Sequence, residues 1–183
     1  MTDTKKLTEI AILVSLAVVL EVIFTGLGAF IPFLQLPYGG RISMAMLPLF
    51  VIVYRHGIKL GVYSGIIYGL LNLMLDAQIW HWASVFLDYL IAFGLIGFSG
   101  LIYLVMPKSR KSFMISIMIG MTLRFISHYI SGIVLFEAWM PEEFANIYWY
   151  SFVYNIYYLL PSMVLIMISS YFLFSRFEEN EIF

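Results

Sequence analysis

Six apolar runs, separated by short polar segments, constrain this chain more than any other feature of its sequence. They cover residues 7–29, 42–55, 58–75, 82–106, 112–136 and 146–174. A helix needs about 20 residues to cross the hydrocarbon of a bilayer, so the first run and the last three are long enough. The run 58–75 is marginal. The run 42–55 is short and contains Pro48, which predicts a tilted, kinked or partly re-entrant segment.

The composition requires that the folded surface face lipid. Hydrophobic residues make up 62% of the chain and charged residues only 11%, whereas a soluble domain carries about 25% charged residues. Backbone amides in lipid need partners within their own segment, which favours helices. We therefore predict an all-α fold, a polytopic membrane helical bundle of six transmembrane helices. It forms a single integral membrane domain over residues 1–183.

Several function classes are excluded by what the sequence lacks. The net charge of -1 argues against a nucleic-acid partner, since such binding needs a basic face. The absence of cysteine excludes disulfides, thiol catalysis and cysteine metal sites. The sequence also lacks a Walker-type loop, an H-E-x-x-H motif and a G-x-S-x-G elbow. We expect no catalytic residues and no enzyme, and any ATP-driven step would need partner subunits.

Basic residues set the expected orientation, because cytoplasmic loops of membrane proteins are enriched in Lys and Arg. If the N-terminus is cytoplasmic, only Arg41 falls in an outer loop and Arg124 falls within a span. The inner segments hold the others: Lys5, Lys6, Arg55, Lys59, Lys108, Arg110, Lys111 and Arg176. This bias predicts that the N- and C-termini are both cytoplasmic.

Three polar residues from three predicted spans share one depth. At about 1.5 Å per helical residue, Asp88 lies roughly 9 Å below the outer surface, His128 roughly 12 Å and Asn155 roughly 13 Å. Polar and ionisable groups inside a membrane are costly and mark functional sites. These residues therefore predict a ligand site in the outer half of the bundle.

Neighbouring charges leave two interpretations open. Arg124 lies one helical turn from His128 and is the obvious structural partner for Asp88. The pair could serve packing alone, or Asp88 could face a cavity and meet a cationic or donor-rich ligand. Glu21, within the first span, could bond a neighbour or line the same cavity. We expect no metal site, because His128 has no second His or Cys at ligand spacing.

Aromatic and small residues form two further patterns. Tyr89, Phe136, Trp139 and Tyr150 crowd the outer level, as an interfacial belt or as a cage for a cation. Glycines at every third or fourth position of the third and fourth spans permit close helix contact, with packing inside the bundle as the default expectation. They are Gly61, Gly65, Gly69, Gly94, Gly97 and Gly100. Ala11 and Ser15 give the first span a flat stripe that could dock another membrane subunit.

Four segments together resemble a known family. They are Leu7–Ala11, Phe86–Leu90, Arg124–Gly132 and Tyr150–Ser162. The chain resembles the thiamine-specific substrate-binding (S) component of energy-coupling factor (ECF) transporters. The resemblance implies a multi-pass protein of the bacterial cell membrane that binds thiamine with high affinity near its outer surface. It also implies an ECF module as partner, with a transmembrane coupling subunit and two ATPase subunits, and no cofactor.

The resemblance also assigns roles to residues of this chain. It implies that Asp88, where some members have Glu, bonds the aminopyrimidine. Tyr89, His128, Tyr150 and Asn155 then belong to the same pocket, with Phe136 stacking where some members have Trp. Trp139 and Arg124 are additional candidates, and Arg124 could instead favour a phosphate. Tyr38 is the nearest candidate for an aromatic contact from the first loop. Ala11 and Ser15 correspond to the stripe that docks the coupling subunit.

Thiamine suits these residues chemically. It joins a permanently positive thiazolium to a planar aminopyrimidine, which a carboxylate, an amide and aromatic faces can recognise. Tyr150 and Asn155 are separated by about 140° around a regular helix. They can line one pocket only if Tyr150 lies in a frayed helix start or if the pocket is wide. The alternatives are an S component for another vitamin or a thiamine precursor, and a membrane enzyme or structural scaffold.

Overall fold

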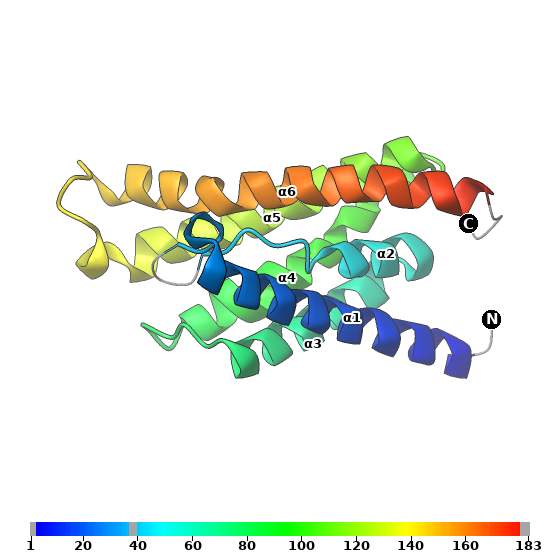
Figure 1. The fold of residues 1–183 in the computed structure, drawn as a ribbon, viewed down its shortest axis with the longest axis horizontal. Coiled ribbons are helices and arrows are strands. Elements are labelled where there is room, and N and C mark those ends of the chain that lie inside the picture. The colour runs from blue at the N-terminus through cyan, green and yellow to red at the C-terminus, as the bar shows by residue number, and fades with distance from the viewer. Residues whose placement is uncertain (1–2, 37–39, 180–183) are drawn as a thin grey trace.

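A computed structural model describes residues 3–36 and 40–179, with side chains described up to residue 174. Helices make up most of this part of the chain. The start of α1 and the end of α6 lie at one end of the bundle, and the α5–α6 connection lies at the other (Figure 1). The long elements are α1 (Asp3–Phe30), α2 (Leu47–His56), α3 (Ile58–Leu75), a helical run from Val85 to Leu104, α5 (Arg110–Leu135) and α6 (Ile147–Glu179).

The all-helical membrane fold predicted from the sequence is confirmed. Five helices are long and apolar enough to cross a membrane, and α2 is a shorter apolar helix. The third helix covers the predicted range 58–75. The others differ from their predicted ranges by a few residues at one or both ends. Polar residues extend α1, α5 and α6 beyond the apolar runs, and the fourth helical run, Val85 to Leu104, is slightly shorter than predicted.

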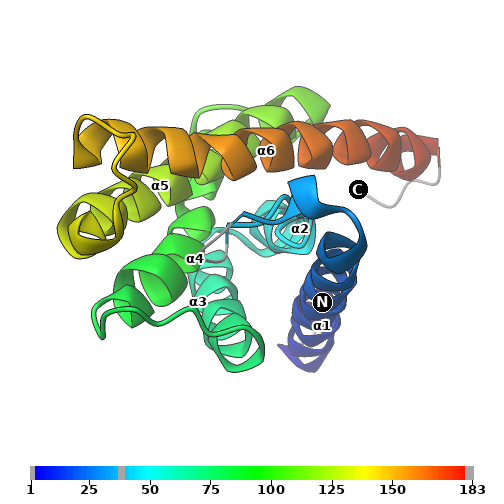
Figure 2. The same ribbon diagram turned by 60° about the vertical axis from the view of Figure 1, so that its left-hand side comes forward.

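The second apolar run differs most from its prediction. Only Leu47–His56 is helical, about 15 Å long, and the preceding residues 40–46 form an extended and turn segment. Pro48 lies in the first turn of α2 and not in a kink, where its missing N–H costs nothing. Figure 2 shows α2 near the middle of the bundle and α1 at its edge.

The extended segment is largely buried, and side chains of α6 accept hydrogen bonds from two of its backbone N–H groups. The N–H of Gly40 donates to the Tyr154 hydroxyl at 2.9 Å, and the N–H of Ser43 donates to the Ser162 hydroxyl at 3.0 Å. Non-helical backbone is tolerated at membrane depth only where protein or a water-filled cavity surrounds it. Residues 40–46 meet that condition.

The run from Val85 to Leu104 is a single helix with changing winding. It starts as a π-helix, η3 (Val85–Ile91), continues through a short α-helical turn, α4 (Ala92–Gly94), and ends as a 3-10 helix, η4 (Leu95–Leu104). Its backbone touches α3 directly. A Cβ atom at Gly65 would overlap the Phe93 carbonyl, and one at Gly97 would overlap the backbone of Val62. The predicted glycine contact therefore packs these two helices against each other and fixes the position of η3.

Candidate functional site

A cavity of about 130 Å³ lies between α1, segment 40–46, α3, η3, α5 and α6. It occupies the half of the bundle away from the start of α1, and Met46, just before α2, is part of its wall. Of the nine residues predicted to bind the ligand, seven line this cavity: Asp88, Tyr89, Arg124, His128, Phe136, Tyr150 and Asn155.

Asp88 sits on the π-helical segment, and α5 holds its carboxylate from one side. His128 Nδ1 lies 3.0 Å from one oxygen, and the Ser131 hydroxyl donates to the other at 2.7 Å. Ser127 donates to the backbone carbonyl of Leu87, one residue before Asp88, at 2.6 Å. Ser127, His128 and Ser131 share one face of α5 because they are three and four residues apart. π-helical turns recur at functional sites, and here one presents the only acidic side chain of the run.

Arg124 binds His128 and not Asp88, so the direct ion pair considered from the sequence is wrong for these two described residues. Its Nε donates to His128 Nε2 at 3.2 Å, its Nη1 contacts the Met46 sulfur, and its guanidinium lies 4.3 Å from the centre of the Phe93 ring. Because Nε2 accepts a hydrogen bond, the imidazole carries its proton on Nδ1 and donates it to Asp88. The imidazole is therefore neutral and joins Arg124 to Asp88.

Asn155 is oriented by its own helix and by Tyr158. Its Nδ2 donates to the Ser151 carbonyl at 2.9 Å, and its Oδ1 accepts from the Tyr158 hydroxyl at 3.0 Å. An amide oxygen has two lone pairs, so one stays available on the cavity side. A Cβ atom at Gly132 would overlap the Ser151 side chain, so the glycine lets α5 approach α6 here.

Tyr150 and Asn155 both line the cavity from within a regular helix. The N–H of Tyr150 bonds the Asn146 carbonyl at 3.1 Å, so this residue is not in a frayed segment. Tyr154 and Tyr158 lie between them around the helix and also line the cavity. The pocket is therefore wide, covering about 140° of α6. The i, i+4 spacing of the three tyrosines was a signal in the sequence that the predicted site did not use.

A second charged group lines the cavity, and little in the sequence indicates it. Arg41 is buried, 7% exposed, and its guanidinium bonds Glu21 at 2.8 Å and Asp76 at 2.6 Å. Glu21 also accepts hydrogen bonds from Ser43 and Tyr68. Both possibilities for Glu21 therefore hold, since it bonds neighbours and lines the cavity. Hydropathy alone assigns Arg41 and Asp76 to outer loops and gives no sign that they meet.

The remaining predicted residues lie elsewhere. Trp139 does not line the cavity; its ring packs 5.9 Å from those of Phe136 and Trp80. Tyr38 lies outside the described residues. Ala11 and Ser15 are exposed on α1 and do not line the cavity. Within residues 3–36 and 40–179, no group of three or more His, Cys, Asp or Glu side chains is arranged to hold a metal ion.

Comparisons with known proteins place this chain in a family. The family model described as thiamine transporter protein matches residues 7–181. The chain belongs to the thiamine transporter family. It is 34% identical to the thiamine transporter ThiT of Bacillus subtilis, over 87% of this chain and 85% of that protein. It is 27% identical to ThiT of Lacticaseibacillus paracasei, over 80% and 75%.

A solved structure supports the fold in the same family. The structure of ThiT from Listeria monocytogenes matches with a TM-score of 0.79 at 25% identity, over 96% of both chains. The relatives in the thiamine transporter family are transporters and not enzymes. With five helices long enough to cross a bilayer, this member is a multi-pass protein of the bacterial cell membrane.

Proposed function

We propose that this chain is the high-affinity thiamine-binding S component of an ECF-type ABC transporter. It captures thiamine from the extracellular side, and a partner ECF module drives uptake with ATP. Membership of the thiamine transporter family supports the substrate. The lining of the cavity supports the mode of binding.

One observation carries the substrate proposal: the Asp88 carboxylate is fixed but not fully used. It accepts bonds from His128 and Ser131, while a carboxylate offers about four lone-pair sites. The remaining sites can accept from the amino group of an aminopyrimidine. Asn155 keeps one lone pair on Oδ1 for a second donor.

The other lining residues either contact the ligand with aromatic rings or orient Asp88. Phe136, Tyr89 and Tyr150 line the cavity with aromatic rings, which suit two flat heterocycles and a positive charge. Both nitrogens of His128 are engaged, by Asp88 and by Arg124. We therefore assign His128 to orienting Asp88 and to ring contact, and not to a hydrogen bond with the ligand.

The fold and the placement of basic residues support this direction of capture. The start of α1 and the end of α6 share one end of the bundle (Figure 1), and the sequence predicts that end to be cytoplasmic. The cavity lies in the opposite half, among residues next to the α3–η3 and α5–α6 connections. Under this orientation the cavity opens toward the extracellular side.

The partner proposal depends on α1. The sequence has no ATP-binding loop, so energy must come from other subunits. Ala11 and Ser15 are exposed on α1 one turn apart, and small residues allow another helix to approach closely. We propose that this stripe docks the transmembrane coupling subunit, which binds the two ATPases.

Thiamine titration of the purified protein tests the substrate proposal. Trp139 packs against Phe136 on the cavity wall, so bound thiamine should quench tryptophan fluorescence saturably. Riboflavin and biotin serve as controls and should leave the signal unchanged. Absence of saturable thiamine binding at micromolar concentrations would reject the proposal, and a response to another vitamin alone would reassign the substrate. Co-purification with an ATPase module tests the partner separately.

A further inference from the structure

The charges that line the cavity do not cancel. Three carboxylates, Glu21, Asp76 and Asp88, face two guanidiniums, Arg41 and Arg124. His128 is neutral, because it accepts a bond at Nε2. The described lining therefore holds one net negative charge, which suits a monovalent cation.

The excess negative charge lies away from Asp88. Arg124 and Asp88 are joined through the imidazole of His128, so their charges offset each other. On the other wall, the single guanidinium of Arg41 is shared between Glu21 and Asp76. That group of three, the Glu21–Arg41–Asp76 triad, is where the uncompensated charge remains.

Within this triad, Asp76 is the carboxylate with room for a ligand. Glu21 has both oxygens engaged, one by Arg41 and the other by Ser43 and Tyr68 at 3.1 and 3.3 Å. Asp76 gives Oδ2 to Arg41, and among the described residues its Oδ1 receives one contact, at 3.3 Å from the Gln78 amide. The side chain of Asp76 is also more exposed, 28% against 13% for Glu21.

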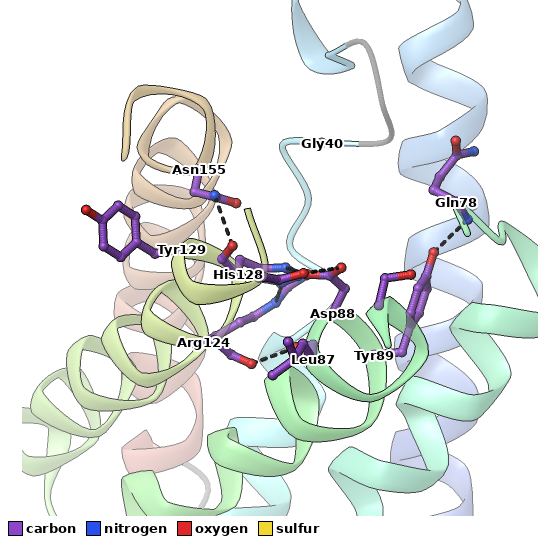
Figure 3. A network of polar contacts seen from close by, with 12 residues as sticks. Gly40, Gln78, Leu87, Asp88, Tyr89, Arg124, His128, Tyr129 and Asn155 are labelled. Atoms are coloured by element: carbon purple, nitrogen blue, oxygen red, sulfur yellow. Dashed lines mark hydrogen bonds and ion pairs between the residues drawn. The ribbon is translucent and has the colours of Figure 1, made fainter. Parts of the chain in front are cut away.

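Tyr89 connects the two segments that carry these acidic groups. It follows Asp88 directly on η3, and its hydroxyl accepts from the N–H of Gln78 at 2.7 Å and donates to the Asp76 carbonyl at 3.4 Å. Figure 3 shows Asp88 and Tyr89 side by side, with Asp88 directed to His128 and the Tyr89 hydroxyl to Gln78. A ligand against Tyr89 would therefore have Asp88 on one side and Asp76 on the other.

We propose that Asp76 forms a cation subsite that receives the positively charged ring of the ligand, while Asp88 receives the neutral amino-bearing ring. A quaternary ring nitrogen has no N–H to donate, so it requires nearby negative charge and not a directional acceptor. The open Oδ1 of Asp76 supplies that charge. This inference rests on the proposed function, since it divides the recognition of thiamine between two carboxylates.

Two ligands and three variants test this division. The ligands are thiamine and its neutral isostere, in which a thiophene replaces the thiazolium, and both are titrated into purified full-length protein. Asp76→Asn should weaken thiamine binding about 10-fold to 100-fold, from the loss of one charge contact at reduced dielectric. Binding of the neutral isostere should change less than about threefold, within the usual effect of a lost neutral hydrogen bond. Asp88→Asn should weaken the binding of both ligands by the same factor.

The Asp76→Asn variant should still fold, because the amide oxygen of Asn can accept a hydrogen bond from Arg41 and the Arg41–Glu21 ion pair remains. Asp76→Glu retains the charge and should recover most of the thiamine affinity. Equal losses for both ligands in Asp76→Asn would mean that Asp76 only supports the cavity wall, and unchanged thiamine binding would remove it from the site. Either result overturns the subsite while thiamine binding by the wild type still supports the proposed function. A wild type that binds neither ligand would reject both.

Discussion

Replacing Asp88 by Asn is the sharpest test of the site. Arg124 donates to Nε2 of His128 and so keeps the imidazole proton on Nδ1. In the Asp88→Asn variant, the new amide oxygen must then face His128, and the amide NH2 group must face Ser131 and the cavity. A donor would replace an acceptor where the ligand brings its own amino group. Losing a hydrogen bond to a charged group costs about 1.5–3 kcal/mol, which weakens thiamine binding about 10-fold to 150-fold.

Fluorescence titration measures this loss, with Asp88→Glu as the matched control. The Asp88→Glu variant keeps the charge but places it one methylene further into the cavity, so its affinity should fall less than that of Asp88→Asn. Elution volume and far-UV circular dichroism verify that both variants fold. Thiamine affinity in Asp88→Asn equal to that of the wild type would show that this carboxylate does not contact the ligand, and the reasoning from its free lone pairs would fail.

Three further changes test the supports of the site. Ser131→Ala removes the 2.7 Å bond that orients Asp88 and should lower thiamine affinity by about 1 kcal/mol, or about fivefold, in the same titration. Gly97→Ala places a methyl group against the backbone of Val62 and should destabilise the bundle by about 1–3 kcal/mol in thermal unfolding. Gly26→Ala is the control and should not destabilise the bundle, because nothing lies within 4 Å of the added Cβ. Equal destabilisation by the two substitutions would contradict the packing argument. Ala11→Trp should leave thiamine binding unchanged but abolish ATP-driven uptake in vesicles reconstituted with the ATPase module, whereas unimpaired uptake would exclude this stripe as the docking face.

Most of the fold was predictable because lipid imposes strong rules. Long apolar runs must be helical, and their number and order follow from hydropathy alone. Residues 42–46 escaped this reasoning because hydropathy does not separate a lipid-facing helix from an extended segment buried by other helices. Pro48 could have signalled the difference, since proline is favoured in the first turn of a helix and is found there in α2.

The position of the cavity was predictable, but the hydrogen bonds among its lining residues were not. Depth counting along three helices brought Asp88, His128 and Asn155 to one level, and the structure places them around one cavity. The partner of Arg124 could not be derived, because the winding of η3 determines where Asp88 points. The Glu21–Arg41–Asp76 triad could not be predicted either, since it depends on the path of a non-helical segment.

The cavity exists because the central helix is short. A helix of normal length in the place of α2 would fill the middle of the bundle through the whole bilayer. With α2 starting at Leu47, only extended chain occupies the half of the bundle away from the start of α1, and Met46, Ser43 and Gly40 become cavity wall. Backbone N–H groups of that extended chain without hydrogen-bond partners would be costly at membrane depth. Tyr154 and Ser162 satisfy two of them from α6, so the wall of the cavity and the binding face of α6 are held by the same contacts.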